Sequence, residues 1–409
     1  MRRLTSNLIR LAVCGLTFSA CAPATVVAPT APPTEPAKPT APPNPTSPPE
    51  DTPAEPGSVE DPGVPATSFM LANPTDIAFD TDGNLYATEC GGTAPDLIKV
   101  DPYGQLTTYS ASRGGFSGDG GPVLESLVNC PAGLAFDGDG NLYIADLGNH
   151  RIRRVDRNGI ISTVAGSGPA NWAEGAFAGD GGPATSAQLN LPTDVVVDAS
   201  GNLYIADAGN ERIRKVDRQG VITTIAGNGT RGFAGDDGLA TDAQLNLDTG
   251  NLRAYSGIAL DADGNLYIAD GSNQRVRMID RRGIITTIAG TDGSTPAGDG
   301  GPATAAVLSN PTGLAFDADG NLYVATGFGL SISDHRIRKI DKDGIITTVA
   351  GAGEPGFGGN GVAAVSAYLR QPQGIAFDDR GSLYIADGGN QRIRRIERGI
   401  IYTVAGGNP

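Results

Sequence analysis

One unit of about 60 residues is repeated six times along this chain, and that repeat constrains the fold more than any other feature. A Leu-Tyr pair marks each copy and is followed by the same pattern of apolar, glycine and arginine residues. Repeats at a fixed period form arrays in which neighbouring units bury each other's apolar faces. The pairs begin at Leu85, Leu142, Leu203, Leu266, Leu322 and Leu383.

Each copy contains four short runs that are rich in β-branched and aromatic residues. In the third copy these runs span 194–198, 202–207, 212–217 and 221–227, and Asp-Ala-Ser-Gly-Asn and Asp-Arg-Gln-Gly turns separate two of the pairs. Such runs predict strands joined by tight turns. Four strands repeated six times predict an all-β, six-bladed β-propeller, with a solenoid of sheets as the alternative.

The repeated segment GNLYIADxGNxRIRxVDxxGIITTVAG resembles the NHL repeat in all six copies, and its extended form resembles the NHL-type repeats of teneurins and bacterial surface proteins. The extra length is a glycine-rich insert before each blade, and its proline and Ala/Leu run predict a loop plus a short helix. Residues 65–76 align without gaps on residues 183–194. We therefore expect each blade to be one continuous segment, and the ring to close by packing blade one against blade six without strand exchange.

The first 64 residues differ in composition from the repeats. Residues 1–20 combine a basic start, an apolar run and small residues, which predicts a secretory signal. The sequence LTFSAC resembles a lipobox, which implies diacylation of Cys21; ordinary export with cleavage nearby is the alternative. The Pro-rich segment 21–64 predicts a disordered stalk. The propeller is then expected over 65–409, lipid-anchored at a bacterial envelope and facing the periplasm or the cell surface.

The charge and the histidines exclude several classes of function. A net charge of −15 disfavours nucleic-acid partners, because the protein's field repels polyanions. The only histidines, His150 and His335, fall in opposite blades and cannot share a zinc ion. The Asp-x-Asp-Gly-Asn segments predict turns rather than calcium loops, because they lack the later bidentate acid.

Residues that recur in most copies are expected to serve the blade itself. An acid ends the second strand and an arginine opens the third, which predicts an ion pair within the blade. The aspartate of each Gly-Asp-Gly-Gly insert is expected to cap the following helix, or else to belong to a face that docks a partner. The acids are Glu89, Asp146, Asp207, Asp270 and Asp387; the arginines are Arg151, Arg212, Arg275, Arg336 and Arg392.

Residues that break the repeat are the better candidates for a site. Asp76 and Asp194 stand where the other first strands begin with glycine, which places two carboxylates at the mouth of the central channel. This resembles the acidic metal ligands of lactonase-type propellers and implies a divalent-cation site. Trp172, Phe328 and Leu330 fall in unusual loops and are expected to form an apolar binding rim on the same face.

Cys90 and Cys130 remain once Cys14 leaves with the signal and Cys21 is committed to lipid. In an exported chain we expect these two to form a disulfide between adjacent blades, with two buried free thiols as the alternative.

The sequence favours a binding or adhesion scaffold that docks a protein or glycan partner through the loop-bearing face of the propeller. A metal-dependent hydrolase or lactonase, using Asp76 and Asp194, is the alternative. Catalysis is the less expected activity, because spacing indicates no Ser/His/Asp set. No cofactor is expected apart from the possible divalent cation.

Overall fold

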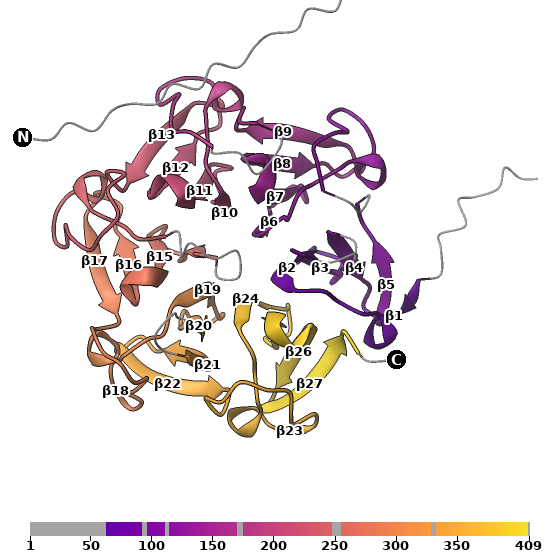
Figure 1. The fold of residues 1–409 in the computed structure, drawn as a ribbon, viewed down its shortest axis with the longest axis vertical. Coiled ribbons are helices and arrows are strands. Elements are labelled where there is room, and N and C mark those ends of the chain that lie inside the picture. The colour runs from indigo at the N-terminus through magenta and orange to yellow at the C-terminus, as the bar shows by residue number, and fades with distance from the viewer. Residues whose placement is uncertain are drawn as a thin grey trace, which may run out of the picture. The chain divides into compact units, whose positions relative to one another are not determined.

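Six antiparallel sheets are arranged in a ring, and each has four main strands that follow one another in the sequence (Figure 1). The computed structural model describes residues 63–91, 96–110, 114–169, 175–247, 255–328 and 333–407. The sheets confirm the predicted six-bladed propeller. None of the helical segments in these ranges is long and apolar enough to cross a bilayer.

The four strands of each blade run from the axis to the outer edge of the ring. Blade 1 contains β2 (Pro74–Phe79), β3 (Leu85–Glu89), β4 (Leu97–Val100) and β5 (Gln105–Thr108); blade 2 contains β6 (Leu134–Phe136), β7 (Leu142–Asp146), β8 (Arg151–Val155) and β9 (Ile161–Ala165). Blade 3 contains β10 (Pro192–Val197), β11 (Leu203–Asp207), β12 (Arg212–Val216) and β13 (Ile222–Ala226); blade 4 contains β14 (Ile258–Leu260), β15 (Leu266–Asp270), β16 (Arg275–Ile279) and β17 (Ile285–Ala289). Blade 5 contains β19 (Pro311–Phe316), β20 (Leu322–Phe328), β21 (Ser333–Ile340) and β22 (Ile345–Ala350); blade 6 contains β24 (Pro372–Phe377), β25 (Leu383–Asp387), β26 (Arg392–Glu397) and β27 (Ile400–Ala405).

The insert before each blade pairs with the outermost strand of that same blade. Three inserts form short strands there: β1 (Val64–Pro65), β18 (Gly301–Pro302) and β23 (Val362–Ala363). Single bridges from Pro122, Pro183 and Leu239 make the same contact in blades 2, 3 and 4. Each insert therefore covers the exposed edge of its own sheet.

The predicted short helix in each insert is only a three-residue 3-10 turn. After the turn in blade 3, Ala187 and Leu189 are completely buried, and this spacing of two is that of extended chain. The turn ends at Ser186 because the chain must become extended for both side chains to be buried between the blades. The insert turns are η1 (Ala66–Ser68), η2 (Val123–Glu125), η4 (Ala184–Ser186), η6 (Ala240–Asp242), η8 (Ala303–Ala305) and η9 (Ala364–Ser366). Similar turns after the second strands are η3 (Leu147–Asn149), η5 (Ala208–Asn210), η7 (Gly271–Asn273) and η10 (Gly388–Asn390).

The ring closes with the same contact that joins consecutive blades. Between blades 2 and 3, the amide of Gly166 donates to the carbonyl of Ala184 at 2.9 Å. Between blades 6 and 1, the amide of Gly406 donates to the carbonyl of Ala66 at 3.0 Å. The main strands of each sheet come from one blade, so the expected closure without strand exchange is confirmed.

Candidate functional site

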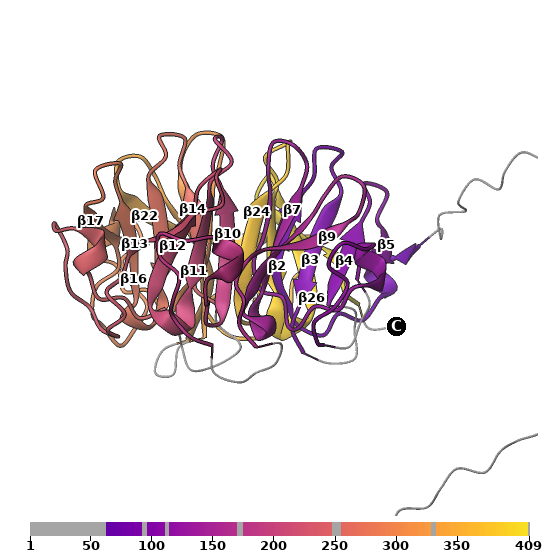
Figure 2. The same cartoon turned by 90° about the horizontal axis from the view of Figure 1, so that it is seen from above.

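The two faces of the ring, seen edge-on in Figure 2, carry different connections. We call the side with the turns between strands one and two, and between strands three and four, the turn face. The opposite side, with the inserts and the connections between strands two and three, is the loop face. The candidate residues from the sequence were all expected on the loop face.

A buried arginine holds the loop face of each of five blades together. In blade 3, Arg214 Nη1 lies 3.3 Å from Asp207 Oδ2, and Arg214 Nη2 lies 2.7 Å from Asp180 Oδ1. The side chains of Arg214 and Asp207 are completely buried, and burial raises the pKa of Asp207 to about 6. One cation thus joins the second strand to the insert. The equivalent arginines in blades 2, 4, 5 and 6 are Arg153, Arg277, Arg338 and Arg394; in blade 5 the buried acid is Asp334 of the third strand.

The predicted ion pair was therefore assigned to the wrong arginine. Arg212 lies opposite Asp207 in the sheet, but its guanidinium stays nearer the surface and donates to the carbonyls of Asn210 and Asn228 at 2.8 and 3.0 Å. The capping role expected for Asp180 is wrong as well, because its carboxylate pairs with Arg214 and the following turn has no side-chain cap. The sequence RIR showed both arginines but not which of them the acids would reach.

Four phenylalanines on the loop face were not predicted from the sequence as functional residues. Each stacks on both arginines of its blade: in blade 3, the guanidinium carbons of Arg212 and Arg214 lie 3.8 and 4.8 Å from the centre of the Phe177 ring. Phe177, Phe233 and Phe357 are nevertheless 40%, 46% and 50% exposed. A signal was present, because a phenylalanine stands three residues before the Asp or Asn of these inserts, whereas blade 5 has proline. The four rings are Phe116, Phe177, Phe233 and Phe357.

Three residues that were expected to form a binding rim cannot be placed as side chains. Trp172 and Leu330 lie outside the described residues, as does Cys21. Phe328 ends strand β20, opposite Ser333, and only its backbone is described. Their part in binding stays a prediction.

The structure brings Asp76 and Asp194 to the axis of the ring, as expected, where both carboxylates reach into the next blade. Asp76 Oδ2 accepts from the amide of Leu134 at 2.8 Å, and Asp194 Oδ2 accepts from the amide of Ile258 at 2.7 Å. Together with Tyr255 they line a cavity of about 100 Å³. The two carboxylates therefore join blades 1 to 2 and 3 to 4 around one small chamber.

Burial controls the charge of this chamber. It raises the pKa of Asp76 to about 7, and it raises the pKa of Asp194 well above its usual value, with a further contribution from the charge of Asp76. Gln373 also lines the chamber and is 2% exposed, and its Oε1 accepts no hydrogen bond from the described residues. The described residues contain no group of three or more His, Cys, Asp or Glu suited to a metal. Cation binding stays a prediction.

The predicted disulfide joins Cys90 and Cys130, whose Cα atoms lie 4.3 Å apart. It ties the end of β3 in blade 1 to the segment that leads into blade 2. Cys130 Sγ also lies 3.5 Å from the Tyr255 hydroxyl, so the disulfide contacts the wall of the axial chamber.

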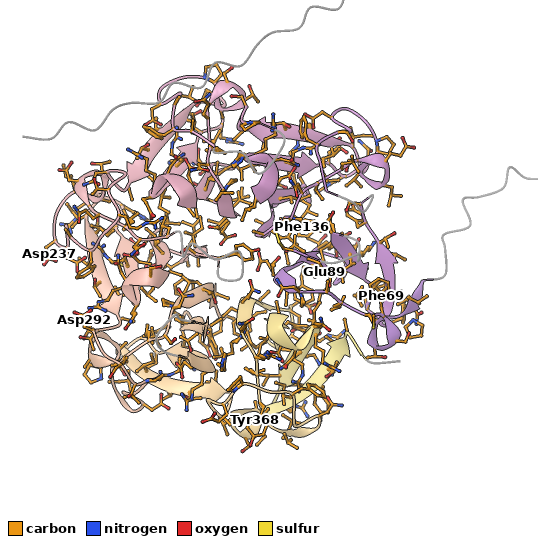
Figure 3. The ribbon with its side chains drawn as sticks, viewed as in Figure 1. Phe69, Glu89, Phe136, Asp237, Asp292 and Tyr368 are labelled. Carbon is orange, nitrogen blue, oxygen red and sulfur yellow. A yellow bond between two sulfur atoms is a disulfide. The ribbon has the colours of Figure 1, made fainter. Side chains whose placement is uncertain are left out.

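Blade 1 lacks the buried arginine of its neighbours. Ile98 occupies the corresponding position in β4 and is completely buried. Glu89, shown among the side chains of blade 1 in Figure 3, is 1% exposed and accepts from the amide of Ala72 at 3.2 Å. Burial raises the pKa of Glu89 to about 8, and the charge of Asp96 adds to the shift. The disulfide thus lies beside the blade whose loop face lacks a buried arginine.

Comparison with known proteins matches the repeats to one family. A family model described as the teneurin NHL domain matches residues 114–176, 172–253, 231–297, 293–356 and 353–409. Human Teneurin-1 is 27% identical over 366 residues, which are 82% of this chain and 12% of that protein. The Arabidopsis thaliana Protein SUPPRESSOR OF QUENCHING 1, chloroplastic, is 29% identical over 344 residues, which are 80% of this chain and 30% of that protein. The chain therefore spans less than a third of either relative.

Solved structures show the same fold at low sequence identity. A protein of unknown function from Bacteroides thetaiotaomicron has a TM-score of 0.57 and 19% identity, covering 80% of this chain and 69% of that one. An auxiliary nutrient binding protein from the same species has a TM-score of 0.55 and 15% identity, with the same coverage of 80% and 69%.

Proposed function

The chain belongs to the teneurin NHL domain family, and on that premise we propose that it is a binding or adhesion scaffold whose loop face docks a protein or glycan partner. The observation that carries this proposal is the set of exposed rings, Phe177, Phe233 and Phe357, each fixed on a pair of arginines. Likeness to an auxiliary nutrient binding protein supports a binding role at the level of the fold alone.

The stacked rings suit binding because they are both exposed and held in place. A ring stacked on a guanidinium is restrained before a partner arrives, so little side-chain entropy is lost on binding. Arginine and aromatic side chains are also those that most often dominate interface energies. Four blades present the same ring, so a repetitive partner can engage several rings at once, and linked contacts strengthen one another.

We further propose that the scaffold is held at a bacterial envelope by lipid on Cys21. The support is in the sequence: a lipobox-like LTFSAC followed by a Pro-rich segment. Pro-rich chain extends by about 3.1 Å per residue, so this stalk would reach roughly 130 Å. Mass spectrometry of the mature N-terminus tests the proposal, and a processed chain that lacks a diacylated Cys21 contradicts it.

Truncating the exposed rings tests the docking face. We expect the triple variant Phe177→Ala, Phe233→Ala, Phe357→Ala to lose the binding that the wild-type protein shows on arrays of immobilised glycans and purified surface-protein domains. Truncating a central interface aromatic costs about 2 kcal/mol or more, or roughly thirty-fold in affinity.

A matched control uses exposed apolar residues outside these rings. Leu124, Leu239 and Val365 lie at or next to the parts of the inserts that pair with the outermost strands, away from the phenylalanines, and are 58%, 54% and 50% exposed. Replacing these three by alanine should leave array binding unchanged. The proposal fails if the wild-type protein binds nothing on the arrays, or if the control variant loses as much binding as the phenylalanine variant.

A metal-dependent hydrolase is the second candidate. The observation in its favour is that Gln373, whose buried Oε1 accepts no hydrogen bond from the described residues, lines the same chamber as Asp76 and Asp194. Pockets for organic ligands usually have volumes of about 300–1,000 Å³. The axial chamber has about 100 Å³, which suits an ion better than an organic substrate.

Calorimetric titration with Ca²⁺ and Zn²⁺ tests ion binding at the chamber. We expect Asp76→Asn with Asp194→Asn to abolish the binding heat, because an amide, unlike a buried carboxyl group, cannot release a proton and become negatively charged when a cation binds. The double variant should not reduce stability, since a neutral amide costs less to bury than a carboxylate. Asp319→Asn, at an exposed turn, is the control. Equal heats from wild type and the double variant would refute the ion site.

A further inference from the structure

The hairpin between β26 and β27 in blade 6 is one residue shorter than its counterparts. Blades 2 to 5 have four-residue segments, such as Asp-Arg-Asn-Gly at 156–159, whereas blade 6 has only Glu397, Arg398 and Gly399. Arg398 adopts a left-handed φ of 51° in this tight turn. The shorter hairpin changes which side chains can cover the neighbouring turn between β24 and β25.

In the longer hairpins, a basic side chain packs over the glycine of the turn between strands one and two. A Cβ placed at Gly140 would lie 3.0 Å from Arg157 Nε, and one at Gly320 would lie 3.3 Å from the Lys342 side chain. The equivalent glycine of blade 6, Gly381, has no such neighbour within 4 Å. No side chain covers Gly381 in this way, and the turn face is open at this point.

The opening is a pocket of about 570 Å³ at the seam where blade 6 meets blade 1. A second hollow of about 270 Å³ shares part of its lining. Phe79 and Tyr384 line both the pocket and the hollow. Their ring centres lie 4.8 Å apart in an edge-to-face arrangement. Tyr103, which is 89% exposed, lines the second hollow. The seam pocket thus combines an aromatic wall with a volume suited to a small organic ligand.

The charged groups of the pocket are not all engaged. Asp80 Oδ1 already accepts from the amides of Asp82 and Asn84 at 3.0 and 2.8 Å, so that carboxylate serves its own turn. Arg395 pairs with Glu397 at 3.3 Å. No carboxylate of the described residues forms an ion pair with the exposed Arg398. The pocket therefore offers a free guanidinium at the tip of the shortened hairpin.

We propose that the seam pocket binds an acidic saccharide. The guanidinium of Arg398 can hold the sugar carboxylate with two parallel hydrogen bonds, a geometry that lysine cannot provide. The exposed carboxylates of Asp82 and Asp379 can accept from sugar hydroxyls, and the ring of Tyr103 can cover the apolar face of a pyranose. This site lies on the turn face and does not depend on docking at the loop face.

Calorimetric titration of the full chain with tri-galacturonate and with neutral galactotriose tests the site. We expect measurable binding of tri-galacturonate and at least ten-fold weaker binding of the neutral trisaccharide. Arg398→Ala should weaken tri-galacturonate binding ten-fold or more. Glu397→Asp with an asparagine inserted after Arg398 restores the long hairpin, covers Gly381 and should also abolish binding.

Two controls separate this site from the loop face and from general charge effects. Arg157→Ala removes an exposed arginine from the long hairpin of blade 2 and should leave the affinity unchanged. The triple phenylalanine variant of the loop face should also bind normally. The proposal is overturned if the wild-type protein does not bind tri-galacturonate, if both sugars bind equally, or if Arg157→Ala weakens binding as much as Arg398→Ala.

Discussion

Arg214→Met is expected to lower the free energy of unfolding by about 3–5 kcal/mol, because it leaves Asp207 buried without its cation. Arg212→Met should cost under about 1 kcal/mol, since exposed or partly exposed charges contribute little. Denaturant unfolding of the two variants and the wild-type protein measures the difference. If Arg212→Met costs as much as Arg214→Met, the ion pair has been assigned to the wrong arginine here.

The cost of Arg214→Met should grow as the pH rises. The pKa of Asp207 in the folded protein, about 6, is above its unfolded value of 3.8, and losing the arginine raises the folded value further. The folded variant then holds a proton that the unfolded chain releases, so its stability falls as the pH rises above the unfolded pKa. Repeating the unfolding measurement at pH 5 and pH 8 should show the larger loss at pH 8.

Removing the disulfide is the second large change. Cys90 and Cys130 are 40 residues apart, and closing a loop of that length stabilises the fold by about 4 kcal/mol in the chain-entropy model. Cys90→Ser with Cys130→Ser should lose most of that free energy, and local opening should begin in blade 1, where Ile98 replaces the buried arginine. Hydrogen exchange in β3 and β4 measures the local effect.

A matched comparison uses the wild-type protein with and without reductant. Reduction should lower the wild-type melting temperature toward that of the double serine variant and leave the variant unchanged. Free thiols at Cys90 and Cys130 in the unreduced protein, or identical melting curves for variant and wild type, would contradict this stabilising role.

The strands could be predicted because each depends on local pattern alone. Residues 202–207 form a short apolar run that ends in aspartate, and the structure begins and ends strand β11 within one residue of that range. The partner of Asp207 could not be predicted in the same way. The choice between Arg212 and Arg214 depends on Asp180, which is 34 residues from Arg214 and is brought there by the insert.

The candidate sites likewise have a part that the sequence predicts and a part that depends on contacts between distant residues. Repeat position alone placed Asp76 and Asp194 at the axis, because a repeated unit puts equivalent residues at equivalent places in the ring. The seam pocket was visible in the sequence only as one missing residue before Gly399. The missing residue opens a pocket only because Phe79 and Pro102 of blade 1 form the opposite wall. The alignment of residues 65–76 on residues 183–194 predicted that the first and last blades pack together, but it did not show the pocket that the missing residue opens between them.

The ring closure has a kinetic consequence. Each blade is one continuous segment and can form during synthesis as soon as its four strands have emerged, because its pairings are local. Closure instead joins residues far apart, such as Gln373 and Asn73, 300 positions from each other. Until that last step the two ends of an open arc carry the same complementary edges that join neighbouring blades. An open arc could therefore add a second chain end to end, and we expect intramolecular closure to compete with such filament growth.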